Sequence, residues 1–148
     1  MKKYFPFVII IAYIISLFLP YASGISVETY QLTTISGILF LKNHWLVASI
    51  LIVLLLIYQW RGKQSLVAGN VLLVLIGVIL LYLYLIPFIG AFGESFIVGL
   101  RLIRDTLATS LMIGYYLSAL FAFVGYFWLA VNNVTKRYKM LFYFIFGV

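Results

Sequence analysis

The chain has 148 residues, of which 66% are apolar and only 9% are charged, and its mean hydropathy is +1.21. Soluble domains average roughly 45–50% apolar and about 25% charged residues, so a soluble fold of this length could not bury so much apolar surface. The formal net charge is +7, but the basic residues form no soluble basic face, so we expect no nucleic-acid partner. The absence of cysteine excludes disulfides, thiolate catalysis and zinc sites built on sulfur.

Four long apolar runs predict an all-α membrane protein, a bundle of four transmembrane helices that forms one domain over residues 1–148. Runs of about 18 or more apolar residues with few charges are typical of membrane spans rather than of helices in a soluble core. The expected spans are residues 4–20, 41–60, 66–88 and 109–131. Outer loops are then expected at 21–40 and 89–108, an inner turn at 61–65 and a cytoplasmic tail at 132–148.

Residues at the ends of the first three runs indicate where each predicted span begins or ends. The first run follows two lysines and precedes Ala22-Ser23-Gly24, a pattern shared with signal peptides, but we interpret it as the first span. The second run begins at Trp45 and is short, so we expect Ile38–Leu41 to extend it while Lys42 reaches the interface. Pro87 is expected to end or bend the third span.

Basic residues set the expected orientation, because positively charged residues in short loops stay on the cytoplasmic side. With both termini and the inner turn inside, seven basic and no acidic residues lie there: Lys2, Lys3, Arg61, Lys63, Lys136, Arg137 and Lys139. The outer side receives three basic and three acidic residues. We therefore expect a multi-pass protein with both termini in the cytoplasm, and the lysine-rich, cysteine-free composition favours a bacterial cytoplasmic membrane.

The first outer loop has the residue pattern of a short β-hairpin. Ile25, Val27 and Thr29 alternate with polar residues, and a stretch rich in β-branched residues follows at 31–35. This pattern predicts a hairpin or strand over the helix ends, with an irregular loop as the alternative. The recognition residues expected in this loop are Glu28 and Tyr30.

The second outer loop predicts an amphipathic helix, because apolar residues recur at helical spacing: Phe96, Leu100, Ile103 and Leu107. The helix either lies flat in the membrane interface or extends the fourth span, and we expect the extension because no helix breaker follows Gly99. Asp105 is placed to pair with Arg101, one turn away. The recognition residues expected here are Glu94, Arg101, Arg104 and Asp105.

No catalytic, cofactor or metal site is expected. An ionisable residue inside a span would mark such a site because it is costly to hold there, and no span centre contains one. The single histidine, His44, has no cysteine or second histidine with which to bind a metal. The first span has only Tyr13 and Ser16 as polar groups, whereas small proton-coupled exporters, which resemble this chain in helix number, depend on a carboxylate there.

Two sets of residues are expected at helix contacts. Asn70 lies one turn inside the third span, where its amide needs a partner on another helix or lines a pore. Gly114, Ser118 and Ala122 recur every four residues, so they form a face of small side chains that another helix of this chain or a partner protein can approach closely. Several tyrosines either line a lipid or quinone pocket or belong to the core and aromatic belts: Tyr82, Tyr84, Tyr115, Tyr116 and Tyr126.

The helix number, the longer first outer loop with β character and the short inner turn resemble the tetraspan plan of claudin-like proteins. The tryptophan and paired cysteines of the claudin loop are absent here, so the resemblance assigns no residue. We expect a non-enzymatic accessory, assembly or immunity-type subunit that contacts membrane lipids and binds another membrane or extracytoplasmic protein, or itself. The alternatives are a homo-oligomeric channel or small transporter, and a lipid-active membrane enzyme using Glu28, Glu94, Asp105 or His44.

Overall fold

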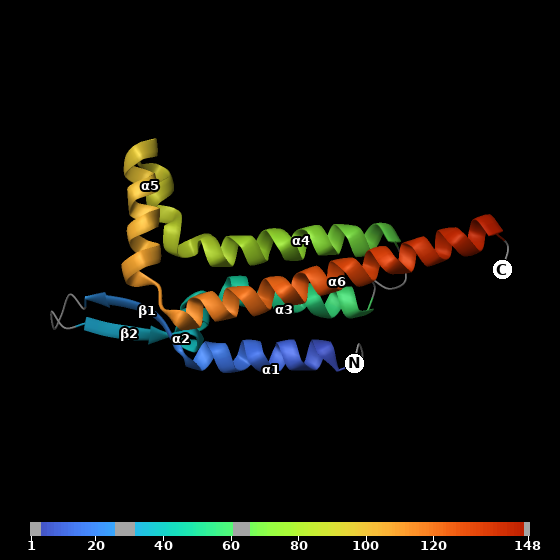
Figure 1. Ribbon diagram of the computed structural model, residues 1–148, viewed down its shortest axis with the longest axis horizontal. Helices are drawn as coiled ribbons and strands as arrows, with labels where there is room; N and C mark the ends of the chain where they lie inside the picture. Colours follow the sequence, from blue (N-terminus) through green and yellow to red (C-terminus); the bar gives the residue numbers. More distant parts are fainter. Residues whose placement is uncertain (1–3, 26–31, 61–65, 147–148) are drawn as a thin grey trace.

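Helices make up most of the structure, and a small antiparallel sheet of two strands accompanies them (Figure 1). The computed structural model describes residues 4–25, 32–60 and 66–146, with only the backbone for 134–146. In chain order the elements are α1 (Phe5–Phe18), β1 (Pro20–Ile25), β2 (Leu32–Ser36), α2 (Gly37–Asn43), α3 (Trp45–Trp60), α4 (Leu66–Leu85), the 3-10 helix η1 (Ile86–Gly93), α5 (Phe96–Asp105), the π-helical turn η2 (Thr106–Ser110) and α6 (Ile113–Phe146).

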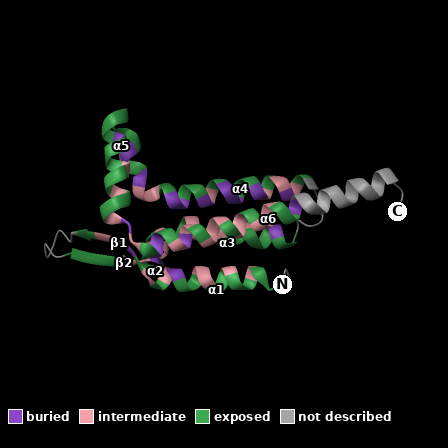
Figure 2. Ribbon diagram, in the orientation of Figure 1, coloured by how far each residue is buried: buried purple, intermediate pink, exposed green. Residues whose placement is uncertain are grey.

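The long helices α1, α3, α4 and α6 run along one common direction, and α5 stands across them at the end where the hairpin lies (Figure 1). α6 packs against both α1 and α4, and α3 packs against α4. Exposed residues lie along all four helices (Figure 2), and many of them are large and apolar. Such a surface suits lipid rather than water, and two segments are long and apolar enough to cross a membrane, Val67–Ile89 and Ile113–Asn133.

The second predicted span is wrong as one straight helix, because α2 and α3 are bent by 94° at the break between them. The Ser36 hydroxyl caps α2 by accepting a hydrogen bond from the Leu39 backbone N–H at 3.4 Å. Phe40 of α2 stacks on Tyr21 of β1, with ring centroids 4.9 Å apart. These contacts hold α2 across the end of the bundle, so that it does not continue α3.

The α2–α3 bend leaves the four-span expectation only partly supported. α4 and α6 qualify as spans, and α2 with α3 would make a third if the bent pair crosses together. α1 has 14 residues and α3 has 16, fewer than the roughly 20 that a membrane helix needs. A mostly helical membrane protein with two or three candidate spans is therefore what the fold shows.

The predicted amphipathic helix forms as α5, but it is wrong to regard it as an extension of the last span. After η2, Leu111 adopts an extended backbone and bridges to Ala22 of β1. The Met112 backbone N–H donates to the Tyr21 carbonyl at 3.0 Å. Since the hairpin engages these backbone groups, α6 begins at Ile113 and not at 109.

α6 is longer than the expected fourth span, because it continues through the segment predicted as a tail and reaches Phe146. Its 34 residues correspond to about 50 Å at ~1.5 Å per residue, well beyond a hydrocarbon core of roughly 30 Å. The candidate membrane span within α6 is Ile113–Asn133.

The predicted β-hairpin is confirmed by the antiparallel pairing of β1 and β2, in which Ser23 faces Thr34 and Gly24 faces Thr33. Residues 26–31, with Glu28, Tyr30 and most of the predicted alternating stretch, lie outside the described residues. The predicted inner turn at 61–65 also lies outside them.

Gly114 lies where the first turn of α6 meets the junction between α1 and β1. A Cβ atom on this residue would lie 2.6 Å from the carbonyl oxygen of Pro20 and 2.9 Å from that of Leu19. Because both neighbours are backbone atoms fixed by the hairpin, only glycine fits here without displacing the chain.

Replacing Gly114 by alanine is expected to lower the free energy of unfolding by about 1–3 kcal/mol, the usual cost of overpacking. Unfolding in mixed detergent micelles measures it. Gly125→Ala is the matched control in the same helix, because its new methyl group would lie 3.4 Å from a side-chain methyl of Ile9. That variant should be as stable as the parent or more so, since alanine favours a helix by up to about 1 kcal/mol over glycine. Equal losses in both variants would contradict the tight contact at Gly114.

Candidate functional site

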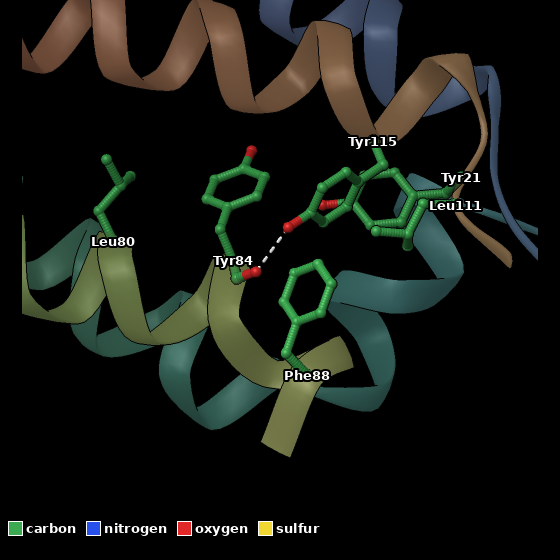
Figure 3. Packing of buried hydrophobic residues seen from close by; sticks show 6 residues of the cluster. All are labelled: Tyr21, Leu80, Tyr84, Phe88, Leu111 and Tyr115. Carbon is green, nitrogen blue, oxygen red and sulfur yellow. Dashed lines mark hydrogen bonds between the residues drawn. The ribbon is translucent and has the colours of Figure 1, made fainter. Parts of the chain in front are cut away.

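Buried side chains join the hairpin to the helix bundle in a cluster that we call the aromatic junction (Figure 3). Its members come from β1, α4, η1, the link between η2 and α6, and the first turn of α6. They are Tyr21, Leu80, Tyr84, Phe88, Leu111 and Tyr115. In the described part of the chain, the junction therefore lies where the hairpin meets α4, α6 and the arm formed by η1 and α5.

Tyr115 makes the polar contact at the centre of the aromatic junction. Its hydroxyl donates a hydrogen bond of 2.6 Å to the Tyr84 backbone carbonyl, seen as the dashed line in Figure 3. Tyr84 is the penultimate residue of α4, and carbonyls in the last turn of a helix have no intrahelical partner. The Tyr115 ring also meets the rings of Tyr21 and Tyr84 edge-on, at centroid distances of 5.3 and 5.6 Å. Tyr115 thus fixes both α4 and β1 to α6.

Several hydroxyl groups are buried together beside Tyr115. Ser118 is fully buried and donates to the Tyr115 carbonyl at 2.9 Å. The Tyr84 hydroxyl lies near those of Tyr13, Tyr21 and Ser118, yet among the described residues it makes no hydrogen bond of good geometry. Burial raises the pKa of Tyr21 well above its usual range, and the nearby Ser118 hydroxyl offsets only part of that effect. The Tyr21 hydroxyl therefore stays neutral at physiological pH and can donate a hydrogen bond.

The predicted small-residue face of α6 lies against this same chain. Gly114 contacts the end of α1, Ser118 is enclosed beside Tyr115, and Ala122 packs against the aromatic junction. At the opposite end of the bundle, the Asn133 side-chain amide donates to the Asn70 side-chain oxygen at 3.2 Å. The structure thus places these predicted contact residues on the α1–α6 and α4–α6 interfaces.

Two of the four recognition residues predicted in the second outer loop, Arg104 and Asp105, form an ion pair. Arg104 bonds to the Asp105 carboxylate at 3.1 Å, and both side chains are largely exposed. The expected partner of Asp105 was Arg101, and this is wrong because the Arg104 guanidinium reaches the carboxylate from the neighbouring position. Glu94 is exposed directly after η1, whereas Glu28 and Tyr30 lie outside the described residues.

Metal-ligating side chains do not gather in the described part of the chain, where no group of three or more His, Cys, Asp or Glu could hold an ion. His44 lies at the break between α2 and α3, with its ring 4.7 Å from that of Phe40. A shallow groove of about 260 Å³ on α4 is lined by Asn70, Val71, Val74 and Leu75. Its lining offers no group that could act as a nucleophile, acid or base.

Comparison with known protein families, with characterised proteins and with solved structures finds no match to this chain. The functional argument therefore depends on the chain's own geometry.

Sequence reasoning missed two residues that organise these contacts, Tyr21 and Asn133. Tyr21 follows Pro20 directly after the first apolar run, and a large aromatic residue at the start of a strand is a signal for core packing. Asn133 lies just after the last apolar run, and Asn70 lies one turn inside the third. Two amides at the same membrane level on neighbouring helices are natural hydrogen-bond partners, and this pairing could have been proposed from the sequence.

Two conservative substitutions test the aromatic junction with the same chemical change. Tyr115→Phe removes the donor to the Tyr84 carbonyl, so we expect it to lower the free energy of unfolding by about 1–3 kcal/mol. Tyr84→Phe removes a buried hydroxyl that lacks a well-formed hydrogen bond, so it should cost less or stabilise the protein. Unfolding of both variants in the same micelles measures the difference. A larger loss for Tyr84→Phe would show that its hydroxyl is the important one.

Proposed function

We propose that this protein is a non-enzymatic subunit of accessory, assembly or immunity type, which binds another membrane or extracytoplasmic protein, or a second copy, through its hairpin. The observation that carries the proposal is the difference between the two edges of the sheet. The outer edge of β1 is covered, because Ala22 bridges to Leu111 and the Ser23 hydroxyl donates to the Thr109 carbonyl at 3.2 Å. In the described residues β2 pairs with β1 alone.

The open edge of β2, Leu32–Ser36, lacks the charged residues and prolines that often protect a strand edge. Leu32 is 74% exposed. An edge of this kind favours addition of a strand from a partner, in which main-chain hydrogen bonds supply affinity and alternate side chains supply specificity.

For the membrane topology we propose four crossings, with α1 and α3 crossing beside α4 and α6. Both short helices run along the same direction as the two longer spans (Figure 1) and expose apolar side chains on their outer faces. Local thinning of the bilayer accommodates spans that are shorter than its hydrocarbon core. The bias of basic residues puts both termini in the cytoplasm, and a bacterial cytoplasmic membrane is the proposed location.

This topology predicts that the hairpin and the end of the α6 span lie on opposite sides of the membrane. Because the chain has no cysteine, single cysteines at exposed Thr33 and Asn132 can be labelled without background. In intact cells, a membrane-impermeant maleimide should label Thr33→Cys, and Asn132→Cys only after permeabilisation. Labelling of both before permeabilisation would contradict the proposed crossings.

Photo-crosslinking tests the partner proposal. A photoreactive residue at Thr34 on β2 should form one discrete protein adduct in the native host cells, and mass spectrometry should identify the same protein from Leu32. Ile52, exposed on α3, is the matched lipid-facing control and should give no protein adduct. An adduct of twice the monomer mass of 16.9 kDa would assign the edge to a second copy. Identical adduct patterns at Thr34 and Ile52, or none at Thr34, would contradict recognition by the β2 edge.

A further inference from the structure

The segment from η1 to α5, which we call the arm, is tied to the membrane at both ends. The preceding apolar span reaches Ile89 and the following one begins at Ile113. The chain therefore leaves and re-enters at one membrane surface. Figure 1 shows the arm standing across the direction of the long helices, so it runs along that surface and does not project away from it.

Exposed apolar side chains occur both in α4 and in the two helices of the arm. They are Leu81 and Leu85 of α4, Ile89 and Phe92 of η1, and Phe96 and Leu100 of α5. The first members belong to a candidate span whose outer face suits lipid. In the arm, Phe96 is 81% and Leu100 is 52% exposed. Lipid that covers α4 is thus the nearest apolar medium for the arm.

Contacts within the protein fix how the arm is rotated. A Cβ atom on Gly99 would lie 2.6 Å from the Ala91 carbonyl oxygen, so α5 packs closely on η1 at this point. Ile103, one turn further on, packs against the aromatic junction. Because residues three and four apart share a helix face, Phe96 and Leu100 lie together along one side of this packed face, and Asp105 lies on the opposite side of α5.

Charge does not explain why the arm would stay at the membrane. It carries two arginines and two acidic residues, so its formal charges cancel: Glu94, Arg101, Arg104 and Asp105. Arginine side chains can still reach phosphate groups while their aliphatic stems lie along apolar surface. Burial of apolar area, at roughly 25 cal/mol per Å², is then the driving force.

We propose that the arm lies flat in the outer leaflet as an interfacial phospholipid-binding helix. Phe96 and Leu100 enter the acyl-chain region, and Arg101 and Arg104 contact lipid phosphates. The arm thereby fixes the depth of the aromatic junction in the membrane, and the hairpin stands at a set height above it. This inference depends on α4 and α6 crossing the membrane, not on the identity of the partner that binds β2.

Spin labels on single cysteines test the proposal, because the cysteine-free chain allows each position to be labelled alone. The full-length protein is reconstituted in phosphatidylcholine vesicles, and collision rates with oxygen, which prefers lipid, and with a water-soluble nickel complex are compared. Labels at Phe96 and Leu100 should show an oxygen-to-nickel ratio close to that of exposed Val74 on α4. Labels at Asp105 and at Thr33 of the hairpin should show a ratio several-fold lower.

The result that would overturn the proposal is a ratio at Phe96 and Leu100 like that at Thr33, since both side chains would then face water. Low collision rates with both reagents would also overturn it, because protein and not lipid would cover the arm. Vesicles that also contain phosphatidylglycerol should give unchanged ratios at these positions. A strong dependence on the anionic lipid would contradict anchoring by apolar burial. None of these outcomes depends on crosslinking from Thr34, so the two proposals can fail separately.

Discussion

The hydrogen bond from the Tyr115 hydroxyl to the Tyr84 carbonyl is the contact on which the hairpin end of the molecule depends. It caps the last turn of α4, where a buried carbonyl left without a partner would cost about 1–3 kcal/mol. It also fixes the point at which the chain leaves α4 for η1. The same Tyr115 ring contacts Tyr21, and Tyr21 in turn stacks on Phe40 of α2. The end of a span, the hairpin and the bend before α3 are therefore parts of one packed unit.

β1 determines how the outer segments connect to the spans. Its backbone pairs with β2 on one side and meets Leu111 and Met112 on the other. This second contact separates α5 from α6 and lets the arm turn across the bundle. It is possible only because Gly114 allows the chain to approach so closely. The contact also leaves β2 as the outer strand of the sheet. The proposed recognition edge and the proposed lipid-binding arm thus follow from the same pairing.

Local patterns in the sequence were enough to predict some elements but not their angles. The apolar run of α4, its end near Pro87 and the hairpin were all readable, because hydropathy and β-branched alternation act over a few residues. The bend at His44 was not, since no proline or glycine lies between Ile38 and Trp60 and the cause is stacking of Phe40 on a residue of another element. The break before α6 likewise arises from pairing with Ala22. At the candidate site, the sequence places Tyr84 and Tyr115 in or near predicted spans, but it does not predict their contact, because the two residues lie far apart in the chain.

The α4–α6 pair shows how polar groups set register where the apolar surroundings cannot. Lipid is as apolar as the side chains it contacts, so burial alone does not favour one alignment of two membrane helices over another. Here one hydrogen bond lies at each end of the interface. Asn133 donates to Asn70 at one end, and Tyr115 donates to the Tyr84 carbonyl at the other. Between these two bonds, Gly77 of α4 lies against the Tyr126 ring of α6, so the two helices approach each other closely there. A slip of one helical turn would break both bonds and close the space at Gly77. The two helices therefore form a frame of fixed register, and this frame holds the hairpin and the arm at one end of the bundle.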